Sequence, residues 1–267
     1  MQALLGKQSS AHFDFMKSGS FYKGHGQQAA ASLRSHLGYD SHQVPSDVYR
    51  DFRRIGFHVF RRWFDNRGIS GICIRHPVVG YCLLINYGED PYRQRFTAAH
   101  EAAHAILDDD KEATISFTEW ARSDLSEVRA NSFASAYLMP PEFLRQIPDV
   151  STWNQEKVVQ WANHLKVSTE ALSYALRDHG LIDAKTQQAM KHVRVPAEEK
   201  SDPELPVTLS PGHRKRREGH LKLGLSTYYV DLCVEAYRYG QISAGRLAEM
   251  LLTAPTGVDR LLRDFGG

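Results

Sequence analysis

The sequence predicts an α+β protein in which a small sheet is followed by a long run of helices. Three segments between residues 57 and 87 are rich in aromatic and β-branched residues and are separated by turn residues. Most of the chain after them has the composition and spacing of amphipathic helices. A length of 267 residues allows one to two domains, and 42% hydrophobic with 24% charged residues excludes a disordered or fibrous chain.

The N-terminus and the cysteines exclude further classes of protein. No basic segment followed by an apolar stretch opens the chain, and no apolar run approaches the roughly 18 residues of a membrane span. We therefore expect a cytoplasmic protein with no membrane partner. Cys73, Cys82 and Cys233 are too few for a disulfide framework or a cysteine-rich zinc module, so we interpret them as reduced core thiols.

The N-terminal part is expected to supply two helices and then the sheet. Residues 1–22 are polar and rich in Gly and Ser, which is typical of a flexible terminus. Helix-forming residues fill 27–36, and a second helix is expected over 47–55 with Ser46 as its N-cap. The expected strands are residues 57–64, 71–76 and 80–87.

After Gly88 the composition changes to strong helix formers. Pro91 stands near the start of a helix that is expected to end at about residue 109. Another helix is expected to follow it and to stop at Pro140 and Pro141, because a proline cannot continue the hydrogen-bond ladder of a helix. A helical hairpin is therefore expected after the sheet.

Residues 149–183 predict two short amphipathic helices joined by a tight turn, a pattern that resembles helix-turn-helix. Ser168 is the expected N-cap and Gly180 the expected C-cap of the second helix. DNA contact is possible but weakly indicated, because this helix carries Glu170 near its start and Arg177 only late, a poor set for reading the major groove. Packing is the favoured interpretation.

The remainder of the chain is expected to be a linker and a separate helical unit. Residues 184–212 mix prolines with charge, which is a linker composition. In the unit over residues 213–267, Ser226 and Ser243 are the expected caps of two helices and Pro255 the expected start of the last. This segment opens on a dense basic run, which we interpret as solvated charge with contact to phosphate as the alternative.

The residues that carry chemistry lie in the helix that starts near Pro91. Residues 100–104 read His-Glu-Ala-Ala-His, so on a helix the two imidazoles lie about 40° apart around the axis and one turn along it. His100 and His104 can therefore bind one metal ion, while Glu101 projects on the same side without ligating it. This geometry is why the pattern indicates zinc with a carboxylate as general base. The alternative is an incidental match on a surface helix.

Two histidines do not complete a catalytic zinc site, which normally takes three protein ligands. Glu127 lies on the next expected helix, where a hairpin would return its carboxylate to the same ion. Asn131, one turn further on, would accept the free N–H of His100 or His104 and fix its tautomer. Spacing alone leaves other candidates for the third ligand: Asp108, Asp109, Asp110, Glu112, Glu119 and Asp124.

These motifs resemble the ImmA/IrrE family of bacterial and phage metallopeptidases. The run RFTAAHEAAH, followed by EVRANSFASAYLMP, is similar to the family pattern R-F-T-x-x-H-E-x-x-H with a later E-x-x-A-N-x-F-A-x-x-L-L-M-P. Gly71 and the pair Ile85-Asn86 also resemble the family, so the similarity covers roughly residues 45–182. Tyr137 stands where the family usually has Leu, a departure that we expect to alter packing only.

The resemblance implies a fold and a ligand set. It implies a zincin-like metallopeptidase domain over residues 23–148, a small sheet with an active-site helix, and it makes Glu127 the third zinc ligand. Glu101 would then take a proton from the attacking water and return it to the leaving amine, as in gluzincin-like endopeptidases. His76, Tyr81 and Tyr137 stay open as candidates for an oxyanion donor.

Two functions from different classes remain to be distinguished. The first, implied by the resemblance, is a site-specific zinc endopeptidase that cleaves a helix-turn-helix repressor and so relieves repression of phage, mobile-element or stress genes. The alternative is a non-catalytic zinc-stabilised transcription regulator or antitoxin. Glu101 between two metal ligands argues for the enzyme, because a purely structural site is usually closed by four protein ligands. Activation of the enzyme by nucleic acid through the basic run at 213–222 is a further hypothesis.

Overall fold

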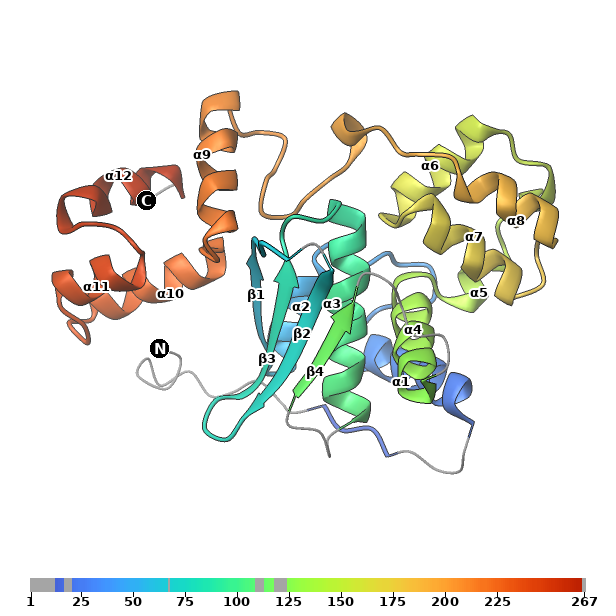
Figure 1. The fold of residues 1–267 in the computed structure, drawn as a ribbon, viewed down its shortest axis with the longest axis horizontal. Helices are drawn as coiled ribbons and strands as arrows, with labels where there is room; N and C mark the ends of the chain where they lie inside the picture. Colours follow the sequence, from blue (N-terminus) through green and yellow to red (C-terminus); the bar gives the residue numbers. More distant parts are fainter. Residues whose placement is uncertain (1–12, 17–20, 67, 109–112, 118–123, 266–267) are drawn as a thin grey trace.

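A four-stranded mixed sheet lies at the centre of the computed structural model, which describes residues 13–16, 21–66, 68–108, 113–117 and 124–265 (Figure 1). The strand order is β1-β3-β2-β4, with β1 parallel to β3 and β2 antiparallel to both β3 and β4. The strands are His58–Arg62 (β1), Ile69–His76 (β2), Gly80–Asn86 (β3) and Ala113–Phe117 (β4).

The three expected strands are confirmed, and β4 is an addition at the edge of the sheet. Sequence inspection missed β4 because its five residues follow a charged run and are too few to show an alternating pattern. Most of the expected N-terminal segment 1–22 falls outside the described residues. The α+β class predicted from the sequence is confirmed.

Helix α3 (Pro91–Leu107) packs against one face of the sheet, on β2 and β3. The helix is rich in alanine, which allows it to approach the strands closely. The approach is tightest at Gly71, where a Cβ would lie 2.6 Å from Oε1 of Glu101 and 2.7 Å from Cγ2 of Thr97. Alternate strand residues form the inner layer of the core, as a period of two requires: Val59, Cys73, Leu83 and Ile85.

Helix α4 (Leu125–Leu138) lies between α3 and α1 (Tyr22–His36) and packs on both. Contact with α1 requires a small residue at Gly26, because a Cβ there would lie 2.4 Å from the carbonyl oxygen of Arg129. The helical hairpin expected after the sheet is thus confirmed, with β4 in its connection. α4 is held on two sides, so the residues on its α3-facing side have fixed positions.

Helix α2 (Val48–Arg54) begins one residue later than expected. Its N-cap is Asp47, whose side chain accepts a hydrogen bond of 3.0 Å from the backbone N–H of Arg50, rather than Ser46. Tyr137 does more than alter packing, since its hydroxyl donates to Oδ2 of Asp51 at 2.8 Å and is fully buried. Tyr137 therefore links α4 to α2.

A second group of helices covers the end of α4 and lies on the right of Figure 1. Ser168 accepts a hydrogen bond of 3.0 Å from the backbone N–H of Ala171, so the expected N-cap of α7 is confirmed. The C-cap is His179 rather than Gly180, which follows it at φ +69°. These helices are Pro141–Leu144 (α5), Gln155–Leu165 (α6), Thr169–Asp178 (α7) and Ala184–Lys191 (α8).

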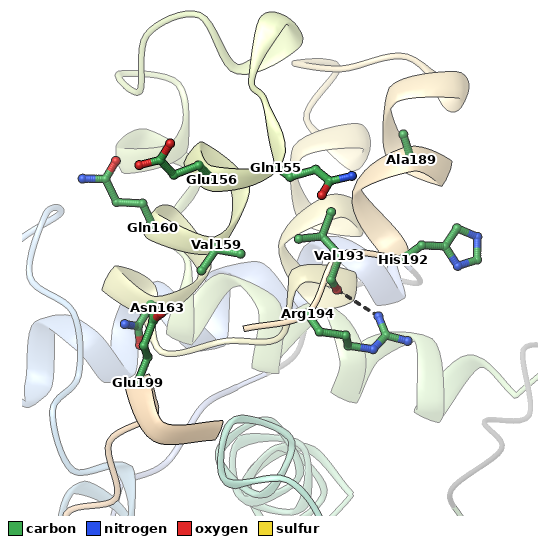
Figure 2. Close-up of a pocket in the computed structure, with 10 residues that line it drawn as sticks. All are labelled: Gln155, Glu156, Val159, Gln160, Asn163, Ala189, His192, Val193, Arg194 and Glu199. Atoms are coloured by element: carbon green, nitrogen blue, oxygen red, sulfur yellow. Dashed lines mark hydrogen bonds between the residues drawn. The ribbon is translucent and has the colours of Figure 1, made fainter. Parts of the chain in front are cut away.

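Helix α8 packs on α7, so the first part of the expected linker at 184–212 is helical instead. A polar cavity of about 750 Å³ lies between α6 and the segment from α8 to Glu199, and Figure 2 shows Arg194 there donating to the carbonyl oxygen of Val193 at 2.9 Å. None of the expected site residues lines this cavity.

The rest of the expected linker is packed against the sheet domain. Arg61, 1% exposed, donates to both carboxylate oxygens of Asp202 at 2.8 and 2.5 Å and to Oε1 of Gln94 on α3 at 2.9 Å. Glu204 lies 3.8 Å from Nη1 of Arg53 and accepts a hydrogen bond of 2.9 Å from the backbone N–H of Thr227. We call residues 200–204 the strap, because they join the sheet domain to the helices that follow.

The C-terminal helices have a small core of their own, which includes Val230, Cys233, Leu247 and Leu251. Ser226 and Ser243 cap α10 and α11 as expected, and Pro255 opens a short 3-10 turn that leads into α12. The helices, on the left of Figure 1, are Pro211–Lys222 (α9), Thr227–Arg238 (α10), Ala244–Met250 (α11) and Val258–Asp264 (α12).

The basic run forms most of α9 and takes part in the packing of this unit. Arg216 donates to Oδ1 of Asp264 at 2.6 Å, and Arg217 donates to the backbone carbonyl of the same residue at 2.9 Å. These contacts favour the structural interpretation of the run over contact with phosphate. Among the described residues, no helix combines the length and the apolar character needed to cross a bilayer.

Candidate active site

Three side chains from α3 and α4 converge on one point. Nε2 of His100 lies 3.0 Å from Nε2 of His104. The carboxylate of Glu127 reaches both rings, with Oε2 at 3.2 Å from Nε2 of His100 and Oε1 at 3.2 Å from Nε2 of His104. The histidines are one turn apart on α3, and Glu127 is in the first turn of α4. The hairpin thus brings together the three residues that the sequence nominated as ligands.

The outer nitrogen of His104 has a carboxylate partner, which identifies its tautomer. Nδ1 of His104 lies 2.6 Å from Oδ2 of Asp108, so this nitrogen carries the proton and Nε2 presents a lone pair to the shared point. Burial lowers the pKa of His100 to about 4, although its hydrogen bonds to Glu127 and Asn131 raise this pKa in part. His100 is therefore neutral at physiological pH, the form in which imidazole binds metals.

These donors fit a metal ion by chemistry and by spacing. Two imidazole nitrogens and a carboxylate that face one another repel unless a cation lies between them. Tetrahedral zinc ligands at bonds of roughly 2.0–2.1 Å lie about 3.3 Å apart. The separations here are 3.0 Å between the rings and 3.2 Å from each ring to Glu127. Within the described residues, His100, His104 and Glu127 form the group of side chains that could hold a metal ion.

Glu101 lies beside this group, fully buried between α3 and the sheet. Neither of its carboxylate oxygens has a hydrogen-bond partner in the part of the chain that the structure describes. Burial raises the pKa of Glu101 to about 7. A carboxylate with a pKa near neutrality is suited to accept and return a proton, which is the role expected of a general base.

Asp108 is a residue whose role sequence reasoning missed. It stood among the candidates for the third ligand, but the structure places it behind His104, at the C-terminal end of α3. Its other oxygen accepts a hydrogen bond from Arg129 of α4, whose guanidinium lies over the ring of Tyr22 at 5.5 Å from the centroid. The spacing of Asp108 four residues after His104 was the available signal, because such residues face each other on a helix.

The other candidates for the third metal ligand lie away from the two histidines or outside the described residues. Asp124 caps α4 by accepting from the backbone N–H of Ser126 at 2.8 Å. The other four lie outside the described residues: Asp109, Asp110, Glu112 and Glu119.

The three candidates for an oxyanion donor are engaged in other contacts. The Tyr137 hydroxyl donates to Asp51, whereas Nδ1 of His76 accepts from two backbone N–H groups of the β2–β3 turn at 3.2 Å. Tyr81 packs edge-on against Phe57 with 5.5 Å between ring centroids. The structure does not bring these side chains to the histidine cluster.

Comparisons with known proteins match the part of the chain that carries these side chains. Residues 52–177 match the model of the IrrE N-terminal-like domain, close to the span over which the motifs resemble the ImmA/IrrE family. A curated relative, the radiation response metalloprotease IrrE of Deinococcus radiodurans, is 33% identical over 125 residues, which are 42% of this chain and 38% of that protein. The chain thus spans well under half the length of this relative. Over residues 52–177, the chain is thus similar to the ImmA/IrrE family of metallopeptidases.

Proposed function

We propose that this protein is a site-specific intracellular zinc endopeptidase that cleaves a DNA-binding repressor or a similar regulator. One observation carries the proposal. Three side chains that could hold a metal ion converge beside Glu101, a buried carboxylate without a hydrogen-bond partner among the described residues. A structural zinc site has no need of such a carboxylate, whereas hydrolysis of a peptide bond needs a base at this position.

In the proposed site, His100, His104 and Glu127 would hold the zinc ion. A bound zinc ion supplies a Lewis acid that acidifies water and polarises a carbonyl oxygen. Glu101 would accept the proton of the attacking water and pass it to the leaving amine, a use for which its pKa of about 7 is suited. Asp108 would hold the ring of His104 in the tautomer that binds metal.

The regulatory substrate is proposed from family resemblance. Enzymes of the ImmA/IrrE type cleave helix-turn-helix repressors, and the relative in Deinococcus radiodurans is named a radiation response metalloprotease. A narrow substrate range also suits an intracellular peptidase, because a broad one would damage the cell. We therefore propose repression of phage, mobile-element or stress genes as the process that the cleavage relieves.

The test is cleavage of repressors encoded beside this gene by the purified, zinc-loaded protein. We expect one defined cut in one repressor, and loss of that cut in Glu101→Gln with zinc still bound. Glu142→Gln, at an exposed position of α5, is the matched control and should cleave normally. Intact repressors with the wild-type protein, together with identical behaviour of Glu101→Gln in cells, would contradict the proposal.

The same proteins distinguish the alternative of a non-catalytic regulator. A zinc-stabilised transcription factor would bind a specific DNA with a steep salt dependence, and Glu101→Gln would bind it equally well. Such a result without cleavage would favour the alternative. A cut that Glu101→Gln abolishes would exclude it.

A further inference from the structure

A second cavity, of about 470 Å³, lies between the helices of the sheet domain and α7. Its walls come from α1, α3 and α4 on one side and from α7 on the other, with Lys191 of α8 at its edge. Much of the lining is apolar, and its apolar side chains include Phe96, Val128, Ala136, Ala171, Tyr174 and Ala175. A cavity of this kind fits an apolar group better than a charged one.

The cavity adjoins the proposed metal centre at Asn131. Asn131 lines it and also contributes to the pKa of His100 through a hydrogen bond. Phe96 lies one turn before His100 on α3, and Val128 directly follows Glu127 on α4. These three lining residues are thus neighbours of the proposed ligands, either adjacent in the chain or one helical turn away.

The two lysine side chains that line the cavity are paired with carboxylates. Nζ of Lys191 lies 3.0 Å from Glu170, and Nζ of Lys23 lies 2.9 Å from Asp178. Lys191 also lies over the ring of Tyr174, at 5.6 Å from its centroid. Both pairs are partly exposed and contribute little stability, but they take up the charges that would otherwise attract a charged ligand.

The face that α7 turns toward the cavity has a consequence for the helix-turn-helix-like pair. Glu170, Tyr174 and Asp178 recur every four residues, so they share one side of α7, and all three line the cavity. This is the second helix of the pair, the one that would have to enter a major groove. Its side chains instead complete a pocket beside the metal centre.

We infer that this cavity is a specificity subsite, which takes a large apolar side chain, such as that of leucine, from the peptide held at the metal centre. The inference rests on the proposed function and names the residues that select the substrate. α7 then serves as one wall of the substrate-binding site. A peptide whose residue at this position is small or charged would leave the apolar wall unfilled or bury an unpaired charge.

Two hydroxamates on the zinc-loaded full-length protein test the inference by isothermal titration. Acetohydroxamate offers only the metal-binding group, whereas a hydroxamate with an isobutyl side chain on the adjacent carbon also offers the apolar group. We expect the isobutyl compound to bind at least about tenfold more tightly, as burial of a leucine-sized side chain allows. Equal affinity of the two compounds would overturn the inference.

Variants that fill the cavity complete the test. Ala171→Phe fills it from α7 and Ser135→Leu from α4, so each should remove the advantage of the isobutyl compound and leave the affinity for acetohydroxamate unchanged. Ala189→Phe is the matched control, on the exposed side of α8 and outside this cavity, and should keep the full advantage. An advantage that survives in folded Ala171→Phe and Ser135→Leu would overturn the subsite. Failure of acetohydroxamate to bind the wild-type protein would instead contradict the metal centre of the proposed function.

Discussion

Asp108 and Arg129 support the proposed metal centre from behind His104. The carboxylate of Asp108 accepts from Nδ1 of His104 with one oxygen and from Arg129 with the other, so its position is fixed from two sides. A carboxylate behind a metal-binding histidine orients the ring and makes its other nitrogen more basic. The ion pair also ties the end of α3 to α4, the two helices that supply the ligands.

The first prediction concerns this carboxylate. Asp108→Asn should weaken zinc binding by about tenfold or more, because a neutral amide is a poorer acceptor for the ring N–H. Competition with a chromophoric chelator measures the affinity, and Asp149→Asn at an exposed turn is the control. An unchanged zinc affinity in Asp108→Asn would show that the contact with His104 has no role in metal binding.

Gly71 lies directly against the side chains of Glu101 and Thr97. A methyl group there would meet the carboxylate of Glu101 and the side chain of Thr97 at 2.6 and 2.7 Å, so Gly71→Ala must displace Glu101 or push α3 from the sheet. We expect loss of cleavage activity with zinc stoichiometry retained. Gly219→Ala on α9, where a Cβ meets nothing within 4 Å, should leave cleavage unchanged. Full activity in Gly71→Ala would contradict the placement of Glu101.

At the scale of elements, α4 is fixed by polar contacts as well as by packing. The hydroxyls of Tyr137 and Tyr39 donate to Oδ2 of Asp51 at 2.8 and 2.7 Å, so this buried carboxylate links α4, α2 and the end of α1. Tyr137→Phe should lower the free energy of unfolding by about 1 kcal/mol, because a buried hydrogen bond is lost with little change of shape. Urea denaturation of the variant and the wild-type protein measures this difference in the free energy of unfolding. Equal free energies of unfolding for Tyr137→Phe and the wild-type protein would show that the Tyr137 hydroxyl contributes nothing to stability.

Much of the fold and of the candidate site followed from local patterns. The two histidines and Glu101 lie within one helix, where spacing alone fixes their relative directions, and Ser168 caps α7 as its sequence context indicated. Features that depend on distant contacts did not follow. β4 is too short to show a pattern, and the position of Asp108 behind His104 depends on its contact with Arg129 of α4.

The strap also escaped prediction, and it shapes the whole molecule. Its proline and charges are typical of a solvated linker, yet Asp202 is 7% exposed and Arg61 is 1% exposed. Whether this segment is a solvated linker or part of a buried ion pair depends on a contact between residues far apart in the sequence. Amino-acid composition does not show such a contact. Through Gln94, the guanidinium of Arg61 also contacts α3, which carries the histidines.

The strap makes stability depend on pH. Burial raises the pKa of Asp202, but the charge and hydrogen bonds of Arg61 outweigh it and hold this pKa below its usual value. Because the folded-state pKa is lowered, the pair contributes its full stability above a pH of about 4, the unfolded-state pKa, and loses it as pH falls through the folded-state pKa.

The corresponding prediction is made with Asp202→Asn. At pH 7 this variant should be less stable than wild type by about 3–5 kcal/mol, because Arg61 stays buried without its partner. Urea denaturation of both proteins measures the difference, which should shrink as the pH falls below about 4. A difference that stays constant with pH would show that the charge of Asp202 is not what holds the strap.

Zinc X-ray absorption of the loaded protein tests most directly whether two histidines and one glutamate form a metal centre. We expect one zinc per chain, with nitrogen and oxygen neighbours at about 2.0–2.2 Å, no sulfur, and loss of tight binding in Glu127→Ala. A sulfur neighbour at about 2.3 Å, or zinc content unchanged by Glu127→Ala, would contradict it.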